Sequence, residues 1–394
     1  MFIRRAYLLA LLFALLPVLL PSQTSHPRDS CSATKIFDQA STLLAQRQYG
    51  EAIKSLNSLQ TCPQLSELET FQLGWLYGRA RQFDTALAIF NKVPQNVPDP
   101  LTHAYAIALS KFELADYRGV IQILGPLNVA GRPESKSANL LAVSYSKLGL
   151  YRQAYPILAR QIDTDPDDLP AYLNLVTVCG EGGDFAKAAD VAAQALKRFP
   201  NSPDVVIVSG AAESLLGRLD LAYQRFTLAV SLAPSRPDAR FFLALMDYDR
   251  AKFLDAVAVL RKANRDGIRD SDLHYLMAEC LLKIEGPNVA AALSELNQAV
   301  QLSPGSVAAR TLRGRLLLER NEVAQAVADL ELAHHKDPAS RSTMYNLARA
   351  YRALGKSNQA SALFRQLRSG SPDTLKELGD RRLNQTLDGN DTSK

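Results

Sequence analysis

A small residue recurs along this chain with a period of 34 residues. The step between recurrences is 34 throughout, except for one step of 36 that contains the segment EGPN. The recurring residues are Ala52, Ala86, Val120, Ala154, Ala188, Ala222, Ala256, Ala292, Ala326 and Ala360. Seven prolines stand 12 residues after members of this series: Pro98, Pro166, Pro200, Pro234, Pro304, Pro338 and Pro372. A period of about 20–50 residues indicates one short unit stacked many times, and ten such units fill residues 33–372.

A second signature precedes the alanine in several units. It reads LGWLY from Leu73, LAVSY from Leu141 and LARAY from Leu347. Together with the alanine and the proline, this pattern resembles the tetratricopeptide repeat. The sequence departs from the pattern locally: Val120 replaces the small residue of the third unit, the eighth unit carries the two extra residues near EGPN, and Arg313 takes an apolar position in the ninth.

The resemblance implies an all-α superhelical solenoid of about ten helix-turn-helix hairpins, with no β-sheet. One hairpin cannot bury its own apolar face, so neighbouring hairpins must stack and share a core. Small residues in each first helix let its partner approach closely, and proline ends each second helix. The small residues in question are Gly74, Ala142, Ala244, Ala278, Gly314 and Ala348.

The two ends of the chain differ from the repeats. Arg4 and Arg5 precede an apolar run of 15 residues, Ala6 to Leu20, which predicts a secretory signal peptide over residues 1–25. The alternative is an uncleaved N-terminal membrane anchor, although the run is shorter than the roughly 20 residues that span a bilayer. We expect residues 373–387 to form a polar helix that caps the last repeat and residues 388–394 to be a disordered tail.

Disulfides can form in an exported protein, so the positions of the cysteines in the predicted repeats indicate which of them could pair. Cys31 precedes the first helix of the first hairpin and Cys62 follows the second, which makes the two chain positions neighbours. We therefore predict a Cys31–Cys62 disulfide, worth about 3 kcal/mol in the chain-entropy model. Cys179 and Cys280 lie in units three repeats apart and are expected to be buried thiols.

No catalytic, cofactor-binding or metal-binding signature stands out, and the chain is therefore predicted not to be an enzyme. The acidic stretch DTDPDDLPAY, from Asp163, suggests a calcium loop, but it lacks the required glycine and glutamate. Since Pro166 belongs to the periodic series, a repeat boundary with acids near the start of a helix is the better interpretation. GEGG at Gly180 fits a turn, and the His334–His335 pair fits the end of a helix. The net charge of +5 is small for this length and does not indicate nucleic-acid binding.

The family's usual role is protein–protein interaction in a concave groove lined by the first helices. Carried over to this chain, the groove positions are rich in aromatic residues. Near the C-terminal end they comprise three arginines and one tyrosine. The predicted groove residues are Phe71, Trp75, Tyr105, Phe112, Phe241, Tyr248, Tyr275, Tyr345, Arg315, Arg349 and Arg352. The alternative is that these rings pack between repeats as core. The family's carboxylate clamp is present only as the fragments Lys136, Asn139 and Asn174.

The C-terminal repeats carry a local excess of positive charge, with 11 Lys or Arg against 5 Asp or Glu between Gly305 and Gly370. This surface could receive an acidic protein segment or an anionic polymer, or it could be an ordinary solvated face. We expect an exported scaffold of a bacterial cell envelope, periplasmic, secreted or anchored, that binds peptide or helical segments of other proteins. The alternative is an envelope-polymer or polysaccharide export factor that uses the basic repeats.

Overall fold

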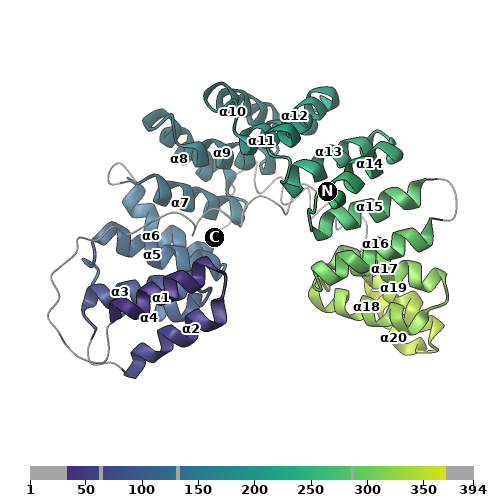
Figure 1. Cartoon of the computed structure of the whole chain (residues 1–394), viewed down its shortest axis with the longest axis horizontal. Helices are drawn as coiled ribbons and strands as arrows, with labels where there is room; N and C mark the ends of the chain where they lie inside the picture. The colour runs from purple at the N-terminus through teal and green to yellow at the C-terminus, as the bar shows by residue number, and fades with distance from the viewer. Residues whose placement is uncertain (1–32, 62–64, 130–133, 285–287, 370–394) are drawn as a thin grey trace. The chain divides into compact units, whose positions relative to one another are not determined.

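Helices make up all the regular secondary structure that the computed structural model describes, which covers residues 33–61, 65–129, 134–284 and 288–369. Within these ranges the backbone forms twenty α-helices and one short 3-10 helix, and no β-strand (Figure 1). The prediction of an all-α repeat fold is confirmed. The helices alternate along the chain as first and second members of ten pairs, and each second helix contains one residue of the periodic series.

The chain divides into two compact units, of which the first ends at Gly182. In this unit the helices of each of the first four pairs pack against each other, and α9 ends the unit. Its elements are α1 (Ala33–Ala45), α2 (Tyr49–Asn57), the 3-10 helix η1 (Ser58–Thr61), α3 (Glu67–Arg79), α4 (Phe83–Phe90), α5 (Pro100–Glu113), α6 (Tyr117–Val129), α7 (Ser135–Lys147), α8 (Tyr151–Thr164) and α9 (Leu169–Glu181).

The second unit begins at Gly183 and repeats the same arrangement. After α10, each pair packs internally and each second helix also packs on the next first helix. The helices are α10 (Phe185–Arg198), α11 (Pro203–Leu215), α12 (Leu219–Leu232), α13 (Pro237–Asp249), α14 (Phe253–Arg265), α15 (Ser271–Lys283), α16 (Val289–Leu302), α17 (Val307–Glu319), α18 (Val323–Lys336), α19 (Arg341–Ala353) and α20 (Ser357–Ser369).

Nine of the ten pairs have a turn that the structure describes in full, and each of these turns contains one left-handed residue at the same place in the period. In the first pair Arg47 has φ 60°, and its N–H donates to Leu44 O while the N–H of Gln48 donates to Leu43 O. These two hydrogen bonds close the C-terminal end of the first helix, and the chain reverses direction there. The left-handed residues are Arg47, Arg81, Ala115, Gly149, Gly183, Gly217, Ala251, Asn321 and Gly355. Gly183 belongs to GEGG, so the prediction of a turn glycine there is confirmed.

The small residues predicted in the first helices do allow close approach of the second helices. A Cβ added to Gly74 would lie 2.7 Å from Phe90 Cε1, and one added to Gly314 would lie 2.6 Å from Leu330 Cγ. Phe90 and Leu330 are buried, so neither has free space to move into. The periodic residues themselves are all buried, Val120 included, which explains why a small side chain recurs there.

The acidic stretch at Asp163 marks the boundary between α8 and α9. Asp168 caps α9 by accepting from the N–H of Ala171 at 3.0 Å. Its other carboxylate oxygen accepts from the Ser135 hydroxyl and, at 3.3 Å, from Asn139 Nδ2, both on α7. Asp168 is therefore a buried link between successive repeats. Among the described residues, no group of three or more His, Cys, Asp or Glu side chains is arranged to hold a metal ion.

Several sequence predictions fall outside the described residues. They are the signal peptide over residues 1–25, the Cys31–Cys62 disulfide, the capping helix over 373–387 and the tail over 388–394. Cys179 on α9 and Cys280 on α15 lie inside the described ranges and are buried thiols, as predicted. Among the described helices, none is both long enough and apolar enough to cross a lipid bilayer.

Candidate functional site

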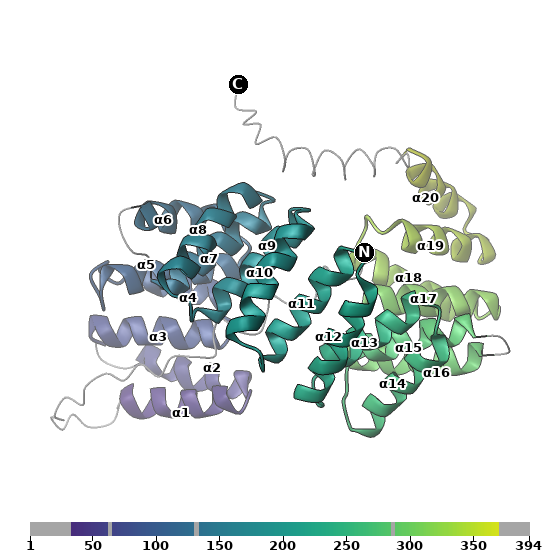
Figure 2. The same cartoon turned by 90° about the horizontal axis from the view of Figure 1, so that it is seen from above.

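The first helices of neighbouring repeats pack side by side within each unit and create a shared face. In the second unit α13 lies against α15 and α17 lies against α19 (Figure 2). In the first unit the same holds for α5, α7 and α9. We call this surface the first-helix face of each unit. The residues predicted from the family's groove positions all lie on these first helices.

In the first unit, three of the four predicted aromatic residues are buried between helices. Phe71 is only 7% exposed, with its ring 5.1 Å from that of Phe90. Tyr105 and Phe112 are equally buried, and burial raises the pKa of Tyr105 above its usual value. Trp75 is half-buried against the same core cluster. The burial of Phe71, Tyr105 and Phe112 is what packing between repeats requires, and it leaves them little surface for a partner.

The aromatic residues of the second unit are less covered. Phe241, Tyr248 and Tyr275 are half-buried on α13 and α15. The hydroxyl of Tyr275 donates to Glu279 Oε1 at 2.8 Å. Burial first, and then the charge of Glu279, raise the pKa of both Tyr248 and Tyr275, so both phenols stay protonated at neutral pH.

The last repeat presents the most open part of this face. Tyr345 is 51% exposed, and its ring meets that of Phe364 edge-on at 6.2 Å. The guanidinium carbon of Arg349 lies 5.8 Å from the centre of the Tyr345 ring, and that of Arg352 lies 5.9 Å from the centre of the Phe364 ring. The two arginines are thus held against aromatic rings. Arg349 Nη1 also donates to Asn346 Oδ1 at 3.4 Å, so only its remaining N–H groups are available to a partner.

Arg315, on α17, comes between Tyr275 of α15 and Tyr345 of α19 in the order of first helices. Its Nε is buried and donates to no protein atom in the described part of the chain, and the nearest carboxylate oxygen, Glu319 Oε1, is 3.9 Å away. This nitrogen is closed to solvent, but the Arg315 side chain as a whole is 42% exposed, so its other N–H donors are accessible to a carboxylate or carbonyl oxygen.

The fragments of the carboxylate clamp lie on the first-helix face of the first unit. Asn174 Nδ2 donates to Asn139 Oδ1 at 2.7 Å, and Asn139 Nδ2 donates to Ser135 O at 2.9 Å. Both amides are therefore engaged within the protein. This chain does not use them as a pair of open donors.

Comparison with known proteins supports the assignment of the repeats. Sequence profiles of the tetratricopeptide repeat match residues 139–203 and 284–341, and a second profile of the same repeat matches 71–100 and 342–374. With the helix pairs already described, this settles the family. The chain is a tetratricopeptide-repeat protein.

One solved structure agrees with the tetratricopeptide-repeat fold, and two further proteins are similar to parts of this chain. A tetratricopeptide-repeat protein from Parabacteroides merdae is 15% identical, with a TM-score of 0.50 over 64% of this chain and 98% of that one. YrrB, described as a TPR protein with an unusual peptide-binding site, is 22% identical, covering 50% of this chain and 100% of its own, with a TM-score of 0.37. The CTR9 homologue of Arabidopsis thaliana is 34% identical over 96 residues, which are 24% of this chain and only 8% of that protein.

Proteins of the tetratricopeptide-repeat family generally mediate protein–protein interaction, and the fold is typically a non-catalytic scaffold. One polar residue of the face was not predicted from the sequence. Glu279, one helical turn after Tyr275, accepts the tyrosine hydroxyl and places a carboxylate among the rings. Its spacing of four from a groove tyrosine is the signal that could have identified it.

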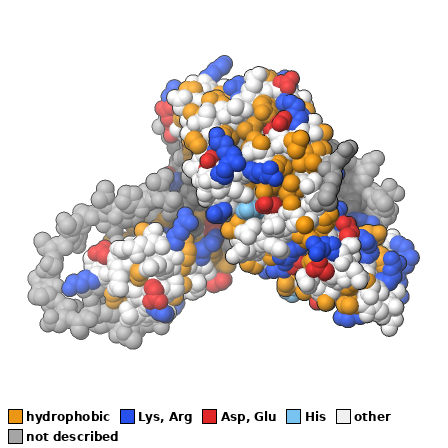
Figure 3. Space-filling view, turned by 45° about the vertical axis from the view of Figure 1, so that its right-hand side comes forward, with side chains coloured by type: hydrophobic (Ala, Val, Ile, Leu, Met, Phe, Trp, Pro, Cys, Tyr) orange, Lys and Arg blue, Asp and Glu red, His pale blue; other side chains and the backbone are white. Residues whose placement is uncertain are grey.

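Figure 3 shows how charged and hydrophobic side chains are distributed over one face of the molecule. Lys and Arg side chains are interspersed with acidic and hydrophobic ones, and on the described residues of that face no single block of one charge dominates.

Proposed function

We propose that this tetratricopeptide-repeat protein is a non-enzymatic scaffold that binds segments of other proteins on the first-helix face of its second unit. The observation that carries the proposal is the open end of that face. Tyr345, half exposed, stands beside Arg349 and Arg352, both held against aromatic rings. Exposed aromatic rings and ordered arginines are the residue types that anchor protein interfaces most efficiently.

The chemistry of the face indicates what kind of segment it takes. Tyr345 offers apolar area, while Arg315 and Arg349 offer donors to acceptors on a partner. Glu279 places negative charge at the other end, beside Tyr275. A partner segment with apolar side chains and an acidic residue near the Arg349 end would match this order of groups.

We further propose that the protein works outside the cytoplasm, as part of a bacterial cell envelope. The support is the N-terminal segment, in which Arg4 and Arg5 precede the apolar run Ala6 to Leu20. Fractionation of cells that express the whole chain, with N-terminal sequencing of the product, tests this. A product with an intact Met1 in the cytosol would contradict export, and an intact N-terminus in the membrane would favour anchoring.

Site-specific photo-crosslinking tests the binding face. A photoreactive phenylalanine analogue at Tyr345 should capture host proteins, whereas the same group at Leu254, which is 70% exposed on the second helix α14, should not. Adding Arg349→Glu to the Tyr345 probe should abolish the capture, because it reverses the charge beside the ring.

Equal capture at Tyr345 and Leu254, or capture at Tyr345 that survives Arg349→Glu, would contradict the proposed face. The same full-length variants can be tested with dextran sulfate as a model anionic polymer. Binding of dextran sulfate that is lost on Arg349→Glu, without any protein capture, would instead support the polymer-export alternative.

A further inference from the structure

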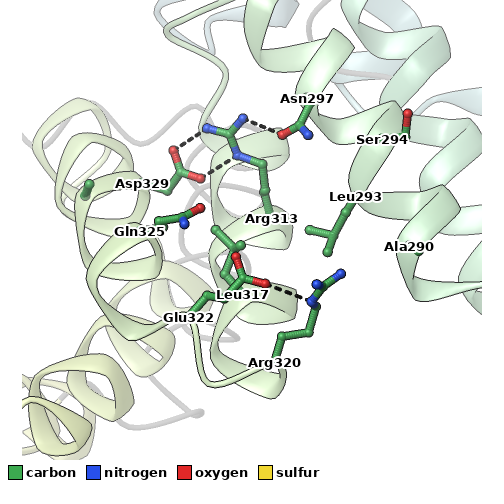
Figure 4. A pocket seen from close by; sticks show the side chains of 11 residues that line it. Ala290, Leu293, Ser294, Asn297, Arg313, Leu317, Arg320, Glu322, Gln325 and Asp329 are labelled. Carbon is green, nitrogen blue, oxygen red and sulfur yellow. Dashed lines mark hydrogen bonds and ion pairs between the residues drawn. The ribbon is translucent and has the colours of Figure 1, made fainter.

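A polar groove lies between the second helices α16 and α18, over α17 (Figure 4). Its volume is about 560 Å³, within the range of roughly 300–1,000 Å³ that ligand sites occupy. Leu293 and Leu317 line its apolar part, and the polar residues around them come from all three helices. None of the residues assigned above to the first-helix face lines this groove, so the two surfaces are distinct.

The floor of the groove is a buried ion cluster. Arg313 donates from Nε to Asp329 Oδ2 at 2.6 Å and from Nη2 to Asp329 Oδ1 at 2.7 Å. Arg310 Nη1 donates to the same Asp329 Oδ1 at 2.6 Å. One carboxylate thus serves two guanidinium groups, so the floor keeps an excess of positive charge.

In other repeats, apolar residues occupy the two positions of this ion pair. At the positions of Arg313 and Asp329, the seventh repeat has Leu243 and Val259 and the tenth has Leu347 and Leu363. A well-packed apolar pair is often at least as stabilising as a buried ion pair of similar volume. Packing alone therefore does not require the charges in the ninth repeat, and a binding role accounts for them.

The unused hydrogen-bonding groups around the groove are mostly donors. Asn297 accepts from Arg313 Nη1 through Oδ1 at 2.9 Å, which leaves its amide N–H groups open. Arg320 pairs through Nε with Glu322 Oε1 at 2.8 Å, which leaves both terminal nitrogens open. Figure 4 shows the Arg320 guanidinium reaching toward Leu293 from the wall opposite Asn297.

The two carboxylates that line the groove, Asp329 and Glu322, already accept from arginines. The groove is thus poor in free acceptors and rich in free donors. A ligand that fits must bring acceptors and negative charge, and an arginine with both terminal nitrogens open matches the two oxygens of a carboxylate.

From these contacts we propose that the α16–α18 groove binds the carboxylate side chains of an acidic segment of a partner protein. Arg320 and Asn297 receive the carboxylate, and Leu293 and Leu317 cover the methylene groups of a Glu side chain. The site would give the scaffold a second docking surface, one that does not depend on the first-helix face.

Fluorescence anisotropy with the full chain tests this, with a fluorescein-labelled hexaglutamate peptide as the probe and hexaserine as its uncharged counterpart. Arg320→Gln should weaken hexaglutamate binding about tenfold, the effect of losing one charge-assisted contact. Ala328→Trp should weaken it at least as much, because this exposed position lets the ring fill the groove without changing any charge.

Two controls separate the groove from long-range attraction and from the first-helix face. Arg261→Gln removes one exposed arginine from α14, and Arg349→Gln removes one from the first-helix face. Neither should change hexaglutamate binding more than about twofold. Loss of binding in Arg349→Gln with none in Ala328→Trp would overturn the groove proposal and leave the proposed function standing. Equal binding of hexaserine, or no binding of hexaglutamate at 50 mM salt, would also overturn it.

Discussion

Replacing Asp329 by isoleucine is expected to destabilise the ninth repeat strongly. The Asp329 side chain is 5% exposed and accepts hydrogen bonds from both Arg310 and Arg313, whose side chains are 13% and 19% exposed. Without the carboxylate, two guanidinium groups face each other in a mostly buried site. Breaking a buried ion pair from one side costs about 3–5 kcal/mol in free energy of unfolding, and we expect a loss in that range.

The converse change, Arg313→Leu, should cost less, because Asp329 keeps Arg310 at 2.6 Å. We expect a loss of about 1–3 kcal/mol, the size of one or two hydrogen bonds to a charged group. The double variant Arg313→Leu/Asp329→Ile places Leu and Ile where the tenth repeat has Leu347 and Leu363. It should be more stable than Asp329→Ile alone, with a coupling energy of at least about 2 kcal/mol between the two positions.

Hydrogen exchange of the α17 and α18 amides is the suitable assay, because long repeat arrays do not unfold in one cooperative step. Urea unfolding followed by circular dichroism then reports whether the rest of the array is unchanged. If the losses of the two single variants simply add in the double variant, Arg313 and Asp329 are not coupled and the account of the buried cluster is wrong.

Three further outcomes are expected. Gly74→Ala should destabilise by about 1–3 kcal/mol, since the new methyl would lie 2.7 Å from Phe90 Cε1, whereas Gly50→Ala on α2, with open space around it, should be neutral or stabilising in thermal unfolding. Burial raises the pKa of Cys280 from 9.0 to about 12, so the thiol of the unfolded chain ionises at lower pH than that of the folded chain. The free energy of unfolding should therefore be constant below pH 9 and fall as the pH rises toward 12, and it should fall less in Cys280→Ala. The native thiol should also resist iodoacetamide at pH 8. Asp168→Ala should cost about 1–2 kcal/mol through loss of the α9 cap and its links to α7, and millimolar Ca²⁺ should leave the melting temperature of the native chain unchanged; a calcium-induced rise would revive the metal-loop interpretation.

Much of the fold could be predicted from the sequence, because its information is local and periodic. The buried alanine series, the small residues at Gly74 and Gly314 and the turn at Gly183 all depend on contacts within one 34-residue unit. Such contacts recur in every repeat, so the pattern is visible in the sequence without knowing how the repeats are arranged in space. Arg313 stood out as a departure for the same reason.

The partner of Arg313 was not evident from the sequence. Asp329 lies 16 residues further along, on the second helix, and no periodic pattern requires an acid there. Only packing of α17 on α18 brings the two side chains together and adds Arg310 to the same carboxylate. The groove beside them therefore follows from tertiary structure.

Phe71 and Tyr345 show most clearly what the sequence determines and what the tertiary structure determines. Both occupy the fifth position of a first helix, and the sequence alone determined that shared register. The structure leaves Phe71 7% exposed and Tyr345 51% exposed. Phe71 packs near the Phe90 ring and the His103 ring of α5, whereas α19 is the last first helix in the described part of the chain. The position of a side chain within its helix is set by the repeat pattern. Its burial depends on which neighbouring helix covers it, and only the tertiary structure supplies that neighbour.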